Sequence, residues 1–415
     1  MKSTTTELTC ELPAVAVPTA LLAVPETFGG RKVADCRVGT LVISGGRIMG
    51  LRASPEPPKI MVLPRLTETH VHLDKCHTVD RCDAVGGDLL AASAAQARDQ
   101  LLWTRDDLTS RMQRGLRELA VAGCGAVRTH IDWDTSKPTA PLAWEVAQDL
   151  VADAKAEGVT LQVAALTSID QMADPIAAEA VARRVAQDGG VLGSFLLDHP
   201  NRRDGLRNLF SLANEFGLAL DFHVDEGLEP ALDGIDLVIE TAREMRHAGP
   251  VLCGHLCSLA VRSDDAVARV ADGLAETGIA VATLPTTNLY LQSRGRGTPD
   301  HRGLTRVHEL IAHGVNVVVG TDNVRDAFCP VGTHDPRFTL GTAVLAAHLD
   351  PPFGDHLPMI TTQAQKALGL TTQTIDTAQI EDLLVFDAPD TSSVLAAAPA
   401  PRPLREILKG DPVDG

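Results

Sequence analysis

Short β-branched apolar runs alternate with Ala-, Leu-, Arg- and Glu-rich stretches of helical period from about residue 120 onward. This alternation is the pattern of successive βα units around a parallel sheet. The clearest runs are GAVRTHID, TLQVAAL, VLGSFLL, LALDFHVD, GPVLCGHL, GIAVATLP and VNVVVGTD. MVLPRLTETHVHLD, near residue 61, adds an eighth, and the repeat of roughly 30 residues suits a barrel unit. The sequence therefore predicts an α/β fold, a closed (β/α)₈ TIM barrel.

The two ends of the chain have a different pattern. Residues 11–60 contain short alternating segments with glycine turns, such as VGTLVISGGRIMGL, and a similar patch, DLLVFDAP, returns near residue 382. We therefore expect both ends to join one small β-sandwich domain. The predicted domains are residues 1–62 plus 378–415 for the β domain and 63–377 for the barrel.

Net charge and composition exclude several classes of partner. The 54 acidic residues outnumber the 37 basic ones, and the resulting charge of −17 repels nucleic acid and anionic lipid. Aromatic residues make up only 3% of the chain, too few to stack on single-stranded bases. No apolar run approaches a membrane span, and the scattered cysteines suit free thiols in a reducing compartment. We expect a cytoplasmic protein that binds neither nucleic acid nor membrane.

Polar residues that can hold a metal or move a proton stand at the ends of the predicted strands. The carboxyl ends of barrel strands are where barrel enzymes assemble their active sites. The candidates are His70, His72, His223, Glu226, His255 and Asp322. His70 and His72, in THVH, are two residues apart on one strand, so their side chains point to the same face and can share an ion.

Each candidate has a simpler interpretation when taken alone. An H-x-H on a strand is a weak signal, a buried histidine is more often a satisfied core residue, and an aspartate after a strand often caps a helix. Their joint position at four strand ends favours a metal site. Three neutral imidazoles and a carboxylate suit Zn²⁺ or Fe²⁺, and such an ion lowers the pKa of a bound water to about 7.

The segments LPRLTETHVHLDK, DFHVDEG, CGHL and the long LYLQSRGRGTPDHRGLTRVHELIAHGVNVVVGTDNVRDAFCPVG resemble the cytosine deaminase branch of the amidohydrolase superfamily over nearly the whole chain. The resemblance implies that the metal ligands are His70, His72, His223 and Asp322. It also implies that Glu226 is the proton shuttle, that His255 orients the nucleophile, and that Asp322 is catalytic as well as a metal ligand. The fourth strand, VLGSFLLDHP, lacks the lysine that bridges two metals in many members. We therefore predict one divalent ion, Zn²⁺ or Fe²⁺.

Three positions depart from the pattern of cytosine deaminases and are predicted to contact the substrate. Ser168 stands where that branch has a glutamine, and a serine cannot supply the paired donor and acceptor of an amide. Asn323 replaces an aspartate, and Phe328 replaces a tryptophan. The stretch TDNVRDAFCP instead resembles N-isopropylammelide amidohydrolases, which belong to the same branch.

Other polar residues near the predicted mouth have two interpretations each. His130 and Asp132, in RTHID, face the same mouth and either hydrogen-bond to the metal ligands or have a purely structural role. Lys75 either meets an acidic substrate or is a solvated loop lysine, which is the more frequent case.

The predicted enzyme is an amidohydrolase that deaminates a small nitrogen heterocycle and releases ammonia. An aminopyrimidine, a triazine, a pterin and a related cyclic amidine are all open as substrates. The alternatives are release of an alkylamine from an N-substituted triazine such as N-isopropylammelide, hydrolysis of a ring amide, and a metal-binding sensor or scaffold without activity. The expected partner is the small-molecule substrate, and a homo-oligomer stays open.

Overall fold

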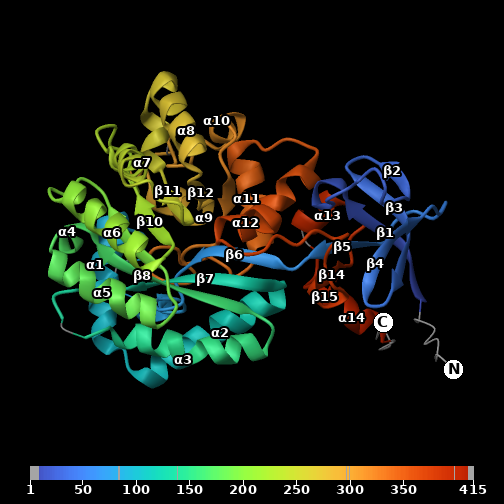
Figure 1. The fold of residues 1–415 in the computed structure, drawn as a ribbon, viewed down its shortest axis with the longest axis horizontal. Coiled ribbons are helices and arrows are strands. Elements are labelled where there is room, and N and C mark those ends of the chain that lie inside the picture. The colour runs from blue at the N-terminus through green and yellow to red at the C-terminus, as the bar shows by residue number, and fades with distance from the viewer. Residues whose placement is uncertain are drawn as a thin grey trace.

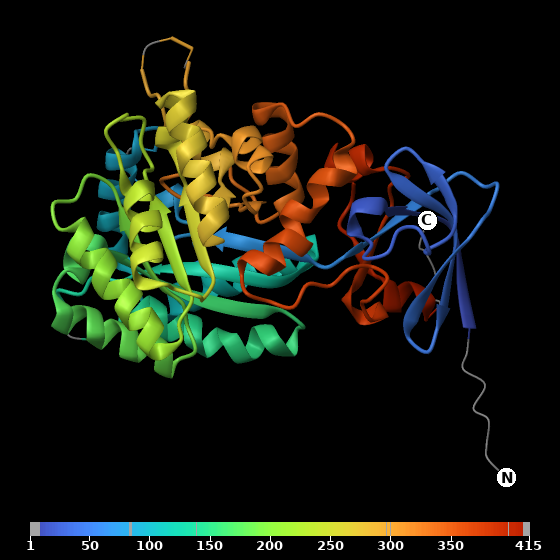
Figure 2. The same cartoon turned by 45° about the horizontal axis from the view of Figure 1, so that its top comes forward.

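The computed structural model describes residues 9–82, 85–137, 139–295, 297–298, 300–396 and 398–409. A large lobe of helices around a parallel sheet lies beside a smaller lobe of strands (Figure 1). β1 (Thr9–Pro18) and α14 (Leu404–Leu408), which come from opposite ends of the chain, both lie in the smaller lobe (Figures 1 and 2).

Eight parallel strands form the barrel in chain order, and each is hydrogen-bonded to the next. They are β6 (Leu66–Val71), β7 (Cys124–Asp132), β8 (Thr160–Ser168), β9 (Leu192–Leu196), β10 (Leu220–Val224), β11 (Val251–His255), β12 (Ala280–Thr283) and β13 (Val317–Val319). The last strand returns to the first where Val71 bridges Asp322, and the Asp322 N–H donates to the His70 carbonyl at 2.8 Å. The barrel is nearly closed, and the predicted fold class is confirmed.

Most of the helices pack around the outside of the barrel, after its successive strands. The longer ones are α2 (Arg105–Ala122), α3 (Leu142–Ala156), α5 (Pro175–Gln187), α6 (Arg202–Phe216), α7 (Gly234–Met245), α8 (Asp264–Thr277) and α11 (Pro336–Ala347). The others are α1 (Leu89–Asp99), α4 (Ile169–Met172), α9 (Pro285–Leu291), α10 (Val307–Ala312), α12 (Thr362–Ala367) and α13 (Thr391–Ala396). In α2, the Thr104 hydroxyl accepts the Asp107 N–H at 3.2 Å, and Gly123 ends the helix with a φ of 100°. Leu108 and Met112, one turn apart, are buried on its inner face.

The smaller lobe is built on one seven-stranded sheet from both chain ends. Its other strands are β2 (Arg31–Val33), β3 (Cys36–Ser44), β4 (Arg47–Arg52), β5 (Ile60–Pro64), β14 (Leu383–Phe386) and β15 (Arg402–Pro403). The order is β15-β14-β5-β1-β3-β2, with β4 paired to β3. The sheet thus joins residues from before and after the barrel, although the predicted domain boundaries stay a prediction.

The run MVLPRLTETHVHLD forms two strands rather than one. Arg65 separates β5 from β6, and its N–H donates to the Asp382 carbonyl of the small sheet at 2.9 Å. The next N–H, that of Leu66, donates to the Gly123 carbonyl beside the barrel at 3.0 Å. The hydrogen-bond partner therefore changes from one sheet to the other within two residues.

No helix in the described ranges combines the length and apolar character that crossing a bilayer requires.

Candidate metal centre and active site

Four potential ligand atoms meet at the mouth of the barrel. The Nε2 atom of His223, on β10, lies 3.0 Å from that of His70 and 3.1 Å from that of His72. Asp322 Oδ1 lies 3.3 Å from His72 Nε2 and 3.6 Å from His70 Nε2. Bonds of about 2.0–2.2 Å to one ion place tetrahedral ligands about 3.3–3.6 Å apart. The structure thus brings the four predicted ligands together at nearly this spacing.

The chemistry of these side chains fits a divalent cation. Burial lowers the pKa of His70, His72 and His223 well below the ordinary value, so the imidazoles are neutral and can act as ligands. Among the described residues, neither carboxylate oxygen of Asp322 has a hydrogen-bond partner, although both are buried. A bound cation would satisfy these oxygens and would separate the facing ring nitrogens.

Glu68 links the strand that carries His70 to the segment that carries Asp322. It accepts the His70 N–H at 2.8 Å and the Thr321 N–H at 3.1 Å, so its carboxylate joins the first strand to the residue before Asp322. Burial raises the pKa of Glu68 to about 8. Glu68 was not among the predicted site residues, although its place in the sequence could have indicated it. It has the same parity on the strand as His70 and His72, so it shares their face.

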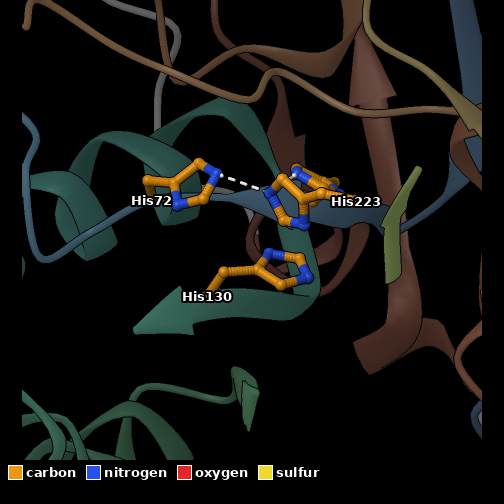
Figure 3. A group of neighbouring side chains, drawn as sticks. His72, His130 and His223 are labelled. Atoms are coloured by element: carbon orange, nitrogen blue, oxygen red, sulfur yellow. Dashed lines mark hydrogen bonds between the residues drawn. The ribbon is translucent and has the colours of Figure 1, made fainter. Parts of the chain in front are cut away.

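His130 completes a cluster of four imidazoles. Its ring centroid lies 4.1 Å from that of His70 and 4.9 Å from that of His223, and Figure 3 shows the His72, His130 and His223 rings gathered at one place. His130 Nε2 lies 3.0 Å from Asp221 Oδ1 in an ion-pair contact, and Asp221 Oδ2 accepts a hydrogen bond from Arg128 Nη1 at 2.8 Å. His130 therefore lies against the centre and is oriented by a buried carboxylate.

Glu226 and His255 stand beside the four ligand atoms. Glu226 Oε2 lies 3.6 Å from His255 Nε2, and His255 Nδ1 lies 3.0 Å from Asn288 Oδ1 on α9. Burial raises the pKa of Glu226 to about 7, which suits a group that gains and loses a proton near neutrality. Asn288, which the sequence did not reveal, orients the His255 ring.

A cavity of about 550 Å³ opens above the centre. Its lining includes Glu226, His255 and Asp322, so the potential proton donors and acceptors face the same space. Much of its wall is apolar. The apolar side chains are Leu89, Leu90, Trp133, Leu166, Phe195, Leu196, Leu197 and Phe328. A volume of this size lies within the usual range of ligand pockets, about 300–1,000 Å³.

The three predicted substrate contacts all line this cavity. Ser168 ends β8 at the wall. Asn323 donates from Nδ2 to Asp326 at 2.7 Å, and the Phe328 ring centroid lies 5.7 Å from Lys75 Nζ. Their contact with a substrate stays a prediction.

Lys75 is not solvated, so the more frequent of its two interpretations, a solvated loop lysine, is wrong. Only 4% of it is exposed, and its Nζ donates to Asp132 Oδ1 at 2.7 Å. Gln100, which follows α1, donates to the other Asp132 oxygen at 2.9 Å. The lysine is buried because Asp132 compensates its charge, and all three residues line the cavity.

Residues 82–402 match the amidohydrolase family. The chain belongs to this family. It is 32% identical over 361 residues to a pterin deaminase of Rhizobium rhizogenes, covering 85% of this chain and 80% of that protein. The predicted family is confirmed, and so is the predicted enzyme class, a hydrolase of carbon–nitrogen bonds.

Solved structures of similar fold include other amidohydrolases. A 5-methylcytosine deaminase of Klebsiella pneumoniae, liganded with 5-fluorocytosine, superposes with a TM-score of 0.76 at 21% identity, covering 95% of this chain and 96% of that one. An N-isopropylammelide isopropylaminohydrolase of Burkholderia multivorans superposes with a TM-score of 0.68 at 20% identity, covering 92% and 93%. At these identities the likeness concerns the fold. The individual roles of the site residues in this amidohydrolase remain predictions.

Proposed function

We propose that this amidohydrolase is a hydrolytic deaminase of a small amino-heterocycle, with a pteridine-sized ring system as the favoured substrate. The observation that carries the proposal is the set of four ligand atoms within 3.0–3.6 Å of their neighbours, with Glu226 and His255 beside them in one cavity. The relative named a pterin deaminase supports the substrate class. So does the cavity of about 550 Å³, which has room for two fused rings.

His70, His72, His223 and Asp322 would hold one divalent ion, Zn²⁺ or Fe²⁺. Such an ion would supply Lewis acidity that makes water a nucleophile at neutral pH. Asp322 then accepts a proton from the attacking water, and His255 stabilises the oxygen as it adds to the amine-bearing ring carbon. Glu226 gives its proton to the ring nitrogen, then takes the proton of the added hydroxyl group and passes it to the departing amine, so that a carbonyl forms and ammonia leaves as a neutral molecule. The proton held by Asp322 then restores Glu226.

The test is a screen of aminopyrimidines, aminotriazines and aminopteridines with the metal-loaded protein, in which released ammonia is measured. We expect ammonia from at least one bicyclic substrate and none from the chelator-treated protein. Alkylamine in place of ammonia, from an N-alkylated triazine, would favour the alternative reaction. No product from any member of the panel would contradict deamination and favour a silent scaffold.

A further inference from the structure

Five of the described residues that line the cavity carry buried side-chain nitrogen or oxygen atoms without a hydrogen-bond partner. They are His72, Gln96, His223, His255 and Asp322. Four of them belong to the proposed metal centre or stand beside it. The fifth, Gln96, has no part in that centre, and both atoms of its amide lack a partner.

Gln96 lies on α1, a helix that is capped at its start and packed against the rest of the large lobe. α1 begins at the capping residue Asp88, which accepts the Ala91 N–H at 3.0 Å. Ala92 and Ala95 pack in a small apolar cluster that includes Leu291. The small alanine side chains bring α1 close to the barrel.

The cavity-facing residues of α1 recur at helical spacing, so one face of the helix covers the cavity. They are Leu89, Leu90, Ser93, Gln96, Ala97 and, just beyond the helix, Gln100. Both views place α1 at the end of the large lobe remote from the small sheet (Figures 1 and 2).

An unpaired buried amide destabilises a folded chain, because its donor and acceptor lose their hydrogen bonds to water. Gln96 is only 3% exposed. Two other glutamines on the cavity wall have protein partners: Gln100 donates to Asp132 at 2.9 Å, and Gln171 donates to Asp134 at 2.8 Å. A ligand in the cavity would give Gln96 the partners that the protein does not supply.

We propose that Gln96 reads the lactam edge, –NH–C(=O)–, of the heterocycle. Its NH₂ group donates to the ring carbonyl oxygen, and its Oε1 accepts from the ring N–H. In a 2-amino-4-pyrimidinone ring, as in pterin, this edge adjoins the amine-bearing carbon, so the two bonds orient that carbon toward the metal centre. The proposal rests on the proposed function and narrows its substrate class to lactam-bearing amino-heterocycles. Ser168, on the same wall, has a hydroxyl group and no amide, so it cannot supply the paired donor and acceptor.

The experiment measures binding of 2,4-dioxopteridine, the expected product of pterin deamination, and of its N3-methyl derivative. The methyl group removes the N3–H donor of the lactam edge that Gln96 is proposed to read and leaves N1–H in place. Dissociation constants are measured with the metal-loaded protein, with Gln96→Met and with the control Gln187→Met, an exposed position at the end of α5 outside the cavity lining. We expect wild type and the control to prefer the unmethylated ligand by about tenfold or more. Gln96→Met should bind that ligand about tenfold more weakly and discriminate little between the two.

The ratio of the two dissociation constants separates a reading role from a structural one, because a general loss of packing weakens both ligands alike. An unchanged ratio in Gln96→Met overturns the proposal, as does failure of wild type to bind either ligand. If Gln96→Met does not fold, Gln96→Glu retains the shape of the side chain but has no donor for the ring carbonyl oxygen, so it should bind the unmethylated ligand more weakly than wild type does. Selective binding without ammonia release in the substrate screen would refute deamination and leave the assignment of Gln96 intact.

Discussion

The Nε2 atoms of His70 and His223 lie 3.0 Å apart, although the residues are separated by 153 positions in the sequence. At most one proton can lie between these two nitrogens. An ion bound by both would replace that contact with two metal–ligand bonds. Because the unfolded chain cannot present this geometry, metal binding should stabilise the fold.

We expect addition of Zn²⁺ to the chelator-treated protein to raise its thermal unfolding midpoint. An ion at a thousand times its dissociation constant contributes about 4 kcal/mol. In His223→Ala the shift should fall to a small fraction of that in wild type. His313→Ala is the control, because His313 is exposed and pairs with Asp272 at 2.6 Å, outside the cluster. If Zn²⁺ raised the midpoint of His223→Ala as much as that of wild type, the ion would have to bind outside the proposed site.

Glu226→Gln should lower turnover by about 10²–10⁴-fold and leave the metal content per chain unchanged. The amide retains the shape of the side chain but cannot deliver a proton to the ring nitrogen. Turnover is followed as ammonia release and metal content by elemental analysis. Glu229→Gln, an exposed position in the same loop, should retain wild-type turnover. Normal activity in Glu226→Gln would refute the role of proton shuttle.

The barrel and its ligand-bearing strand ends could be predicted because both follow from local rules. Strand and helix periods are read within one βα unit, and parallel strands place their carboxyl ends on one rim. The two-residue spacing of His70 and His72 adds that both lie on one face. The same parity rule could have found Glu68.

The position of α1 over the cavity could not be predicted, because it depends on packing between distant segments. Ala92 and Ala95 pack against residues from α9 and from the loop after β13. No local pattern shows that such a helix covers a cavity, so Gln96 carried no signal in the sequence. The burial of Lys75 could not be predicted for a similar reason: its partner, Asp132, is 57 positions away.

Asp107 should make the free energy of unfolding depend on pH in the acid range. Burial acts to raise its pKa, but the hydrogen bonds and charges of Arg81 and Arg111 lower it to about 2. A carboxyl whose pKa is lower in the folded state stabilises the fold above its ordinary pKa of about 4. The contribution is lost as the pH falls from about 4 to about 2. We estimate it at about 1 kcal/mol after solvent screening.

The measurement compares the thermal unfolding midpoint of wild type with that of Asp107→Asn, both free of metal, between pH 7 and pH 2. The two midpoints should differ most at pH 7 and converge at the acid end. Asp106→Asn is the matched control, because Asp106 lies in the same first turn of α2 but is exposed and forms no ion pair within the described part of the chain. A difference between the two unfolding midpoints that stays the same at every pH would contradict the lowered pKa of Asp107.

Asp221→Asn should be the most destabilising of these substitutions. Arg128 is buried and donates to Asp221 at 2.8 Å, so loss of the carboxylate leaves a buried guanidinium without its counter-charge. Loss of one partner of such a pair costs about 3–5 kcal/mol. Urea unfolding followed by tryptophan fluorescence reports on the barrel, which contains Trp133 and Trp144.

Two further variants separate the buried charge from a general packing effect. Replacing both partners, as Arg128→Met with Asp221→Leu, should restore much of the lost stability, because no buried charge is left unpaired. Glu179→Gln breaks the exposed pair with Arg183, at 2.6 Å, and should cost about 1 kcal/mol or less. If Asp221→Asn costs no more than Glu179→Gln, the barrel does not depend on this carboxylate. His130 would then need another explanation for its orientation against the metal centre.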